Sequence, residues 1–213
     1  MLTDTDLRRG GTGTRPAPKR RGQRLGGALG NARLTSIVGA TLLVLLAIEG
    51  ATIPAIQPLL SVHIFVGMLL LGPVSLKLAS TGYRFVMYYA GSSQYVREGP
   101  PAPLMRLLVA PVLVLSTLTL FGTGVVLLAV PHRGMIVGLH KASFIVWFGA
   151  TTIHVLAYAL RAGRRILAEW SRPAGGRQAR LAVTGIALAV GIFTALVTYP
   201  LAHPWFHHFH GPH

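Results

Sequence analysis

The chain contains no cysteine among its 213 residues. Without thiols it forms no disulfide, ligates no iron–sulfur cluster through cysteine and attaches no haem covalently in the c-type manner. Any haem bound by this chain is therefore held non-covalently.

Charged side chains are scarce as well. Asp, Glu, Lys and Arg make up 12% of the chain, against ~25% in an average protein. Hydrophobic residues make up 52%, and the mean hydropathy is +0.56. A soluble domain of this composition would expose too much apolar surface. Crossing a bilayer takes ~20 apolar residues, and five runs reach that length, at about 33–53, 62–81, 104–130, 137–160 and 181–201. We therefore expect an all-α fold, an integral-membrane bundle of five transmembrane helices.

Acidic residues are the scarcest charged class, with 5 Asp and Glu against 20 Lys and Arg and a net charge of +15. Such a charge suits nucleic acid, but no nucleic-acid-binding fold or aromatic pattern accompanies it. All Lys and Arg except Lys77, Arg133 and Lys141 lie before the first run, or around the second–third and fourth–fifth connections. Basic connections stay cytoplasmic. The distribution predicts a multi-pass protein of the inner (cytoplasmic) membrane, with the N-terminus inside and the C-terminus outside.

The chain divides into three parts. Residues 1–32, rich in Gly, Arg, Thr and Pro, are expected to be disordered; residues 33–201 form the bundle, and residues 202–213 form an outer tail. That tail is rich in histidine, with His203, His207, His208, His210 and His213. Clustered imidazoles bind transition metals, so His207, His208 and His210 are candidate metal ligands. The alternative is a flexible tail with only adventitious metal affinity.

Ionisable side chains inside the apolar runs repeat at one spacing. His63 and Lys77 lie fourteen residues apart on the second run, and His140 and His154 lie fourteen apart on the fourth. At ~100° and ~1.5 Å per residue, fourteen steps return to almost the same helix face and rise roughly 21 Å. Because both runs cross from outside to inside, we expect an outer level with His63 and His140 and an inner level with Lys77 and His154. Polar side chains in hydrocarbon usually face a cavity, a cofactor or each other.

The outer level is suited to a haem iron. Two neutral imidazoles from two helices at one depth can ligate a b-type haem on opposite faces, so His63 and His140 are the predicted ligands. Gly67 lies one turn below His63, where the missing side chain would leave room for a porphyrin. Small and aromatic residues suited to a flat macrocycle continue the His140 face, at Ser143, Phe144, Trp147 and Thr151. The competing interpretation places both histidines at the interface, in contact with water or headgroups.

Residues 61–160 resemble the bacterial membrane b-type cytochrome superfamily of di-haem four-helix bundles, which includes hydrogenase-type b cytochromes and ferric-reductase-like transmembrane proteins. The resemblance rests on HIFVG in the second run and LHKASFIVWFGATTIHV in the fourth. It implies a four-helix core with one haem near each membrane face, the outer one on His63 and His140. His154 matches the inner ligand of the fourth run, but Lys77 stands where the second inner histidine is expected. The resemblance thus implies haem b, with one site or two.

Several roles stay open. Lys77 either snorkels to the cytoplasmic interface, neutralises a haem propionate or a substrate anion, or ligates an inner iron as a neutral amine. His154 either ligates that iron or bonds to another helix. Glu49 either accepts the proton on a ligand histidine's second ring nitrogen, helps to protonate a quinone, or contacts water. The core is formed by the first four runs or by the last four, and Glu49 is relevant only in the first case.

The predicted function is electron transfer by a membrane b-type cytochrome, between quinol or a redox partner and an acceptor. Its expected partners are the lipid bilayer, a quinone, an outer redox subunit as the resemblance implies, and further copies of the chain in a homo-oligomer. Two other classes compete: a cofactor-free transporter subunit or assembly factor, and an outer-face metal-handling protein that uses the tail. Whether the chain is itself an oxidoreductase enzyme is left open. The sequence contains no soluble-enzyme motif: no phosphate-binding Gly loop with lysine, no HExxH and no GxSxG.

Overall fold

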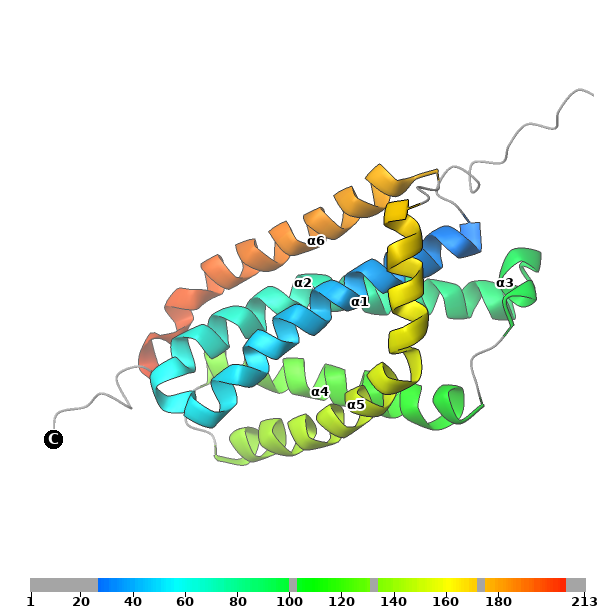
Figure 1. Cartoon of the computed structure of the whole chain (residues 1–213). Coiled ribbons are helices and arrows are strands. Elements are labelled where there is room, and N and C mark those ends of the chain that lie inside the picture. The colour runs from blue at the N-terminus through cyan, green and yellow to red at the C-terminus, as the bar shows by residue number, and fades with distance from the viewer. Residues whose placement is uncertain (1–26, 100–102, 131–133, 172–174, 206–213) are drawn as a thin grey trace, which may run out of the picture.

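The computed structural model describes residues 27–99, 103–130, 134–171 and 175–205, and within these ranges the chain is helical, without strands (Figure 1). The all-α prediction is confirmed. The elements are α1 (Gly27–Thr52), the 3₁₀ turn η2 (Ile53–Ala55), α2 (Ile56–Tyr89), α3 (Ser93–Arg97), the π-helix η3 (Met105–Val109), α4 (Ala110–Ala129), α5 (Gly134–Ser171), α6 (Arg177–Thr198) and the 3₁₀ turn η4 (Tyr199–Ala202).

Four helical segments of the described chain are long and apolar enough to cross a membrane: Gly27–Tyr89, Met105–Ala129, Gly134–Ser171 and Arg177–Trp205. The first segment, 63 residues long, contains both α1 and α2, because the chain turns at η2. The two helices are antiparallel. Asn31 and Thr35 in the first turns of α1 bond to Ser80 in the last third of α2, whereas Glu49 near the end of α1 bonds to His63 near the start of α2. Such helices suggest a multi-pass protein in a lipid bilayer.

Helices α1 and α2 share an apolar core of Val38, Leu42, Val66 and Leu70, all buried. Helix α6 lies against another face of α2, at a close crossing of two glycines. A Cβ built on Gly72 would lie 2.1 Å from the Ala187 carbonyl oxygen, and one on Gly191 would lie 2.1 Å from that of Leu69. Small residues let membrane helices approach backbone to backbone, and this crossing fixes α6 on α2.

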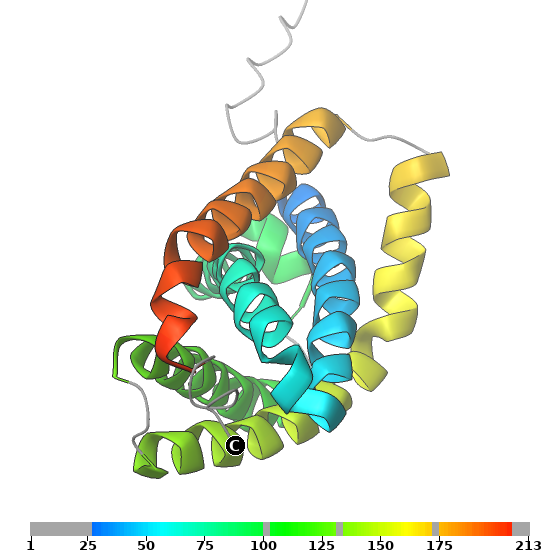
Figure 2. The same cartoon turned by 90° about the vertical axis from the view of Figure 1, so that its left-hand side faces the viewer.

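Helices α4 and α5 form a second antiparallel hairpin. The Trp147 indole donates from Nε1 to Thr117 Oγ1 over 3.1 Å, and the His140 ring lies 3.0 Å from Thr123 Oγ1. Helix α5 also contacts α1. The end-on view in Figure 2 shows the α4–α5 hairpin on one side of α1 and α2, with α6 on the opposite side.

The second half of α5 turns away from α4 and crosses to α1 and α6 (Figure 1). There the buried Glu169 carboxylate lies between two arginines. Arg33 Nη1 of α1 is 2.7 Å from Oε2, and Arg180 of α6 donates to Oε1 from both Nε and Nη2. Arg180 Nη1 also donates to the Gly175 carbonyl over 3.1 Å. We call these three side chains the Glu169 cluster; it ties α1, α5 and α6 together.

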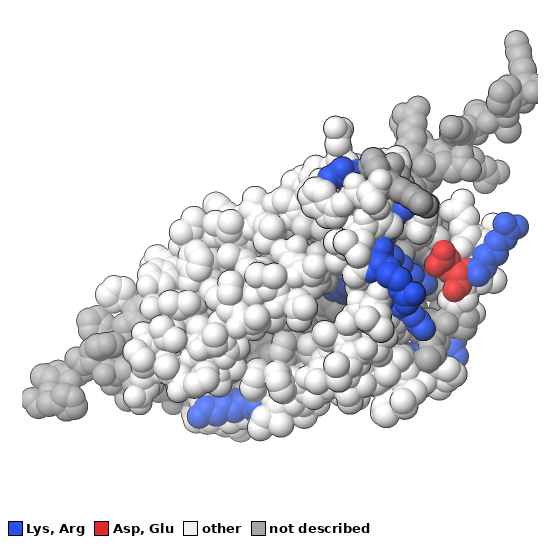
Figure 3. All heavy atoms as spheres, viewed as in Figure 1, with Lys and Arg blue, Asp and Glu red and all other residues white. Residues whose placement is uncertain are grey.

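The outward faces of the long helices carry large apolar side chains, such as Leu156, Leu160 and Phe193, which are 76%, 79% and 68% exposed. On the face shown in Figure 3, most Lys and Arg atoms gather at the end where α3 and the start of α6 lie, with one further group towards the opposite end. An apolar belt therefore separates the charged ends of the bundle.

The observed helices extend beyond the predicted apolar runs. Helix α1 begins at Gly27, inside the stretch expected to be disordered, where Ala28, Gly30 and Ala32 are buried and Asn31 donates to the Ser80 carbonyl. Helix α5 continues to Ser171 instead of ending near 160, because the Glu169 cluster holds its last turns. Residues 1–26 of the predicted N-terminal part and residues 206–213 of the tail lie outside the described residues.

Candidate functional site

The ring of His63 on α2 faces the end of α1. Its Nδ1 lies 2.9 Å from Glu49 Oε1 and 2.9 Å from Thr52 Oγ1. The Thr52 hydroxyl already donates its hydrogen to the Glu49 carbonyl over 2.6 Å, and a carboxylate only accepts. In the neutral ring, Nδ1 must therefore carry the proton, which leaves the Nε2 lone pair available to a metal.

His140 on α5 is held in the same tautomer by α4. Its Nδ1 lies 3.0 Å from Thr123 Oγ1 and 3.1 Å from the Leu120 carbonyl oxygen. A carbonyl only accepts, and the Thr123 hydroxyl donates to the Thr119 carbonyl over 2.7 Å. Nδ1 is again the donor. A Cβ on Gly124 would lie 3.4 Å from His140 Cε1, so this glycine gives the imidazole its place against α4.

His63 lies on α2 and His140 on α5, and both of these helices contact α4. Each ring is fixed through Nδ1 by a different helix, α1 for His63 and α4 for His140. Neither Nε2 has a hydrogen-bond partner among the described residues. Two neutral imidazoles that both keep Nε2 free have the donor chemistry of an axial ligand pair.

Gly67 faces a different neighbour from the one expected. A Cβ built on Gly67 would lie 3.4 Å from Glu49 Oε1, so the missing side chain leaves room for the carboxylate that reaches His63. The second oxygen, Glu49 Oε2, is buried and accepts no hydrogen bond within the described part of the chain. Gly67 therefore contributes to the outer level by admitting Glu49.

The face of α5 between its two histidines is turned inwards. Ser143 and Trp147 are buried, and Ser143 Oγ donates to the His140 carbonyl over 2.9 Å. The Phe144 ring stacks on Trp147 at 6.3 Å between centroids and an interplanar angle of 29°. Thr151 Oγ1, one turn before His154, is buried without a hydrogen-bond partner in the described residues. Ser143 and Trp147 thus lie on the side of α5 that packs into the bundle.

Lys77 on α2 is bonded to α1, and His154 lies on α5, which α1 also contacts. The Lys77 ammonium donates from Nζ to the Thr35 carbonyl over 2.7 Å, and a Cβ on Gly39 would lie 3.0 Å from Nζ. Lys77 is thus directed across the hairpin at α1. The His154 ring packs on Tyr158, with 4.9 Å between centroids.

The tail prediction lies mostly outside the described residues. His203 is described and exposed, whereas His207, His208 and His210 are not described. Within residues 27–99, 103–130, 134–171 and 175–205, no group of three or more His, Asp or Glu could hold a metal ion. A metal site on the tail remains a prediction.

The Glu169 cluster is the polar centre that sequence reasoning misses. Arg33 and Arg180 look like ordinary cytoplasmic charges, and Glu169 is separated from both by long stretches of chain. One signal was present: Glu169 is the single acidic residue in the basic stretch between the fourth and fifth runs. An isolated carboxylate among arginines is a candidate for a buried ion pair.

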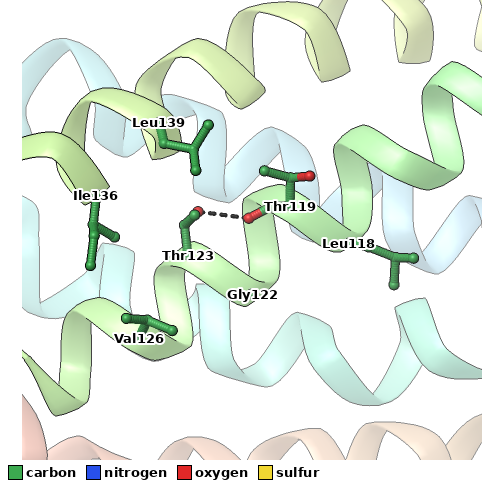
Figure 4. A pocket seen from close by; sticks show the side chains of 7 residues that line it. All are labelled: Leu118, Thr119, Gly122, Thr123, Val126, Ile136 and Leu139. Atoms are coloured by element: carbon green, nitrogen blue, oxygen red, sulfur yellow. Dashed lines mark hydrogen bonds between the residues drawn. The ribbon is translucent and has the colours of Figure 1, made fainter.

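A groove opens between α4 and α5 beside the outer level. It has a volume of about 260 Å³ and an apolar lining of Leu118, Thr119, Gly122, Thr123, Val126, Ile136 and Leu139. Figure 4 shows the side chains of both helices around it and the Thr123–Thr119 hydrogen bond in its wall. Thr123 thus lines the groove and also contacts His140.

Comparison of the chain with family models, with curated proteins and with solved structures finds no match in any of the three.

Proposed function

We propose that this chain is a membrane b-type cytochrome that holds one haem b at its outer level through His63 and His140. It would carry electrons between quinol or a redox partner and an acceptor. The observation that carries the proposal is that each imidazole meets acceptors at Nδ1, Glu49 for His63 and the Leu120 carbonyl for His140, and leaves Nε2 without a partner in the described residues. Haem, when bound, supplies a reversible one-electron carrier.

The neighbours of the two histidines act as positioning residues. Glu49 and Thr52 fix the His63 ring, and Thr123 with the Leu120 carbonyl fixes the His140 ring. Such outer partners set the tautomer and raise the basicity of the ligand nitrogen. The two rings differ in this respect, since a carboxylate supports His63 and only neutral acceptors support His140.

The proposed topology has five membrane crossings in the inner membrane, with the N-terminus in the cytoplasm. The turn at η2 separates α1 from α2 and supports counting them as two crossings. The core would consist of α1, α2, α4 and α5, because α1 supplies the carboxylate that reaches His63. Helix α6 would lie outside it, fixed on α2 by the Gly72–Gly191 crossing.

The visible spectrum of the purified protein tests the haem assignment. We expect one haem per chain with a reduced-minus-oxidised b-type signal, lost in His63→Ala and in His140→Ala. His154→Ala is the matched control, since it removes the third intramembrane histidine, and we expect it to keep the signal. A signal that survives both outer substitutions would overturn the ligand pair. A chain without haem under full haem supply would favour the competing class, a cofactor-free membrane protein.

Glu49→Gln tests the positioning role separately. The amide keeps the size of the side chain and removes the charge that supports the His63 ring. Loss of an outer partner costs about 10- to 100-fold in metal affinity, and a less basic ligand raises the midpoint potential. We expect weaker haem retention and a higher potential in Glu49→Gln, with both properties unchanged in the exposed-site control Glu98→Gln.

The orientation can be tested by single-cysteine labelling, because the chain has no cysteine of its own. In the proposed topology, Ser93→Cys on α3 lies on the cytoplasmic side, and Met135→Cys on the first turn of α5 lies on the outer side. Both sites are exposed. A membrane-impermeant maleimide added to intact inverted membrane vesicles should label only Ser93→Cys. The reverse pattern would place the N-terminus outside.

A further inference from the structure

Three side-chain atoms in the described residues are buried without a hydrogen-bond partner: Glu49 Oε2, Arg106 Nε and Thr151 Oγ1. The first belongs to the outer level. The other two lie on η3 and on α5, towards the inner level. Arg106 Nε and Thr151 Oγ1 are donors, and a buried donor without a partner costs free energy, so both call for an acceptor.

The helix register places Arg106 and Thr151 near His154. Thr117 of α4 bonds to Trp147 of α5. The two helices are antiparallel, so a residue before Thr117 lies beside a residue equally far after Trp147. Arg106 is therefore level with about Tyr158, one turn beyond His154. Thr151 lies one turn before His154. The segment η3 contacts α5 directly, so Arg106 and Thr151 lie on either side of the His154 level.

Lys77 brings a further positive charge to this level from α2, since its Nζ bonds to the Thr35 carbonyl of α1, the helix that also contacts α5. No described carboxylate neutralises it. Glu49 pairs with His63, Glu169 pairs with Arg33 and Arg180, and Glu98 is exposed at the end of α3. The remaining acidic residues, Asp4 and Asp6, lie outside the described residues. Inside this part of the bundle, Lys77 and Arg106 are cations without an anion.

The missing partner must accept several hydrogen bonds and carry negative charge. An ammonium, a guanidinium and a hydroxyl on three helical elements at this level would suit a phosphate group better than a planar carboxylate, because phosphate offers acceptor oxygens in several directions. The helix that begins at Pro103 and continues through η3 into α4 adds the positive end of its dipole. Lys77 lies roughly 21 Å along α2 from His63, within a hydrocarbon core of ~30 Å, so it would reach the headgroup region of the cytoplasmic leaflet.

We propose that Lys77, Arg106 and Thr151 bind the phosphate group of an anionic phospholipid at the inner level, beside His154. The lipid would lie against η3 and α5 with its headgroup between them and α2. This site does not depend on a haem at the outer level. It also assigns Lys77 to an anion and not to an iron.

Lipid-dependent thermal stability of the purified, delipidated full chain tests this site. Phosphatidylglycerol, phosphatidylcholine and inorganic phosphate are added separately, and bound lipid is counted by native mass spectrometry. We expect one retained phosphatidylglycerol per chain and a rise in the melting temperature with that lipid. Losing one charged hydrogen bond should weaken its binding at least about tenfold in Lys77→Met and in Arg106→Gln. The matched control is Lys141→Gln, an exposed lysine near the other end of the bundle, and we expect it to bind as the wild type does.

Arg106→Gln and Thr151→Val give the cleanest result. Arg106 Nε and Thr151 Oγ1 make no hydrogen bond in the described residues, so these substitutions break no such contact and should leave the lipid-free melting temperature at or above the wild-type value. Only the increment due to phosphatidylglycerol should shrink. If Lys77→Met fails to fold, these two variants still decide the question.

Three outcomes would overturn the proposal. Equal lipid binding by wild type, Arg106→Gln and Thr151→Val would show that these side chains do not form the site. Stabilisation by inorganic phosphate alone, without retained lipid, would assign the site to a free anion. A change in the haem spectrum of Lys77→Met, with lipid binding intact, would assign Lys77 to an iron instead.

Discussion

The Glu169 cluster offers the sharpest prediction for stability. The carboxylate is 2% exposed, and the side chains of Arg180 and Arg33 are 4% and 11% exposed. Removing one partner of a buried ion pair costs about 3–5 kcal/mol, because the remaining charge is left uncompensated. Glu169→Gln leaves two arginines in that state, so we expect at least the lower end of this range. In terms of the unfolding equilibrium, the expected change is roughly 10²-fold or more.

The same geometry ranks the two arginines. Arg180 donates to Glu169 from two nitrogens and to the Gly175 carbonyl from a third, whereas a single hydrogen bond joins Arg33 to Glu169. Arg180→Met should therefore destabilise the protein more than Arg33→Met. A double-mutant cycle with Glu169→Gln should show both pairs to be non-additive, since the three side chains form one network.

Reversible unfolding in mixed micelles, followed by helical circular dichroism, measures these changes. Glu98→Gln is the matched control, because Glu98 is exposed at the end of α3; its stability should lie within about 0.5 kcal/mol of wild type. If Glu169→Gln also falls within that limit, the cluster is solvated, and its role as the tie between α1, α5 and α6 is refuted.

Two further substitutions test the packing of the helices. Gly72→Ala places a Cβ against the Ala187 carbonyl and should cost at least about 1–3 kcal/mol by overpacking. Gly185→Ala, where nothing lies within 4 Å of the added atom, should be neutral or stabilising in the same thermal assay; equal effects of the two changes would contradict the close crossing. Trp147→Phe removes the 3.1 Å hydrogen bond to Thr117 and should cost about 1 kcal/mol. An unchanged denaturation midpoint would show that this bond contributes nothing.

Several features of the protein follow from the sequence alone. Hydrophobic runs of bilayer length predict the long helices, because intrahelical hydrogen bonds satisfy the backbone in lipid. The fourteen-residue spacing of His63 with Lys77, and of His140 with His154, predicts shared helix faces, because an α-helix has a fixed period. The haem itself stays a prediction.

Contacts between distant segments were decided only by the tertiary structure. Glu49 reaches His63 because the turn at η2 folds α1 back on α2 and Gly67 leaves room for the carboxylate. Glu169 meets Arg33 across a sequence separation of 136 residues, a pairing that no local pattern encodes.

The tautomers of His63 and His140 likewise depend on acceptors that other helices supply. The sequence determined which runs are long and apolar enough to cross a membrane and which side chains share a helix face, because composition and helical periodicity act along one chain segment at a time. Which group faces which was decided by the packing of the helices, because hydrogen bonds and ion pairs depend on distances between segments that are far apart in the sequence.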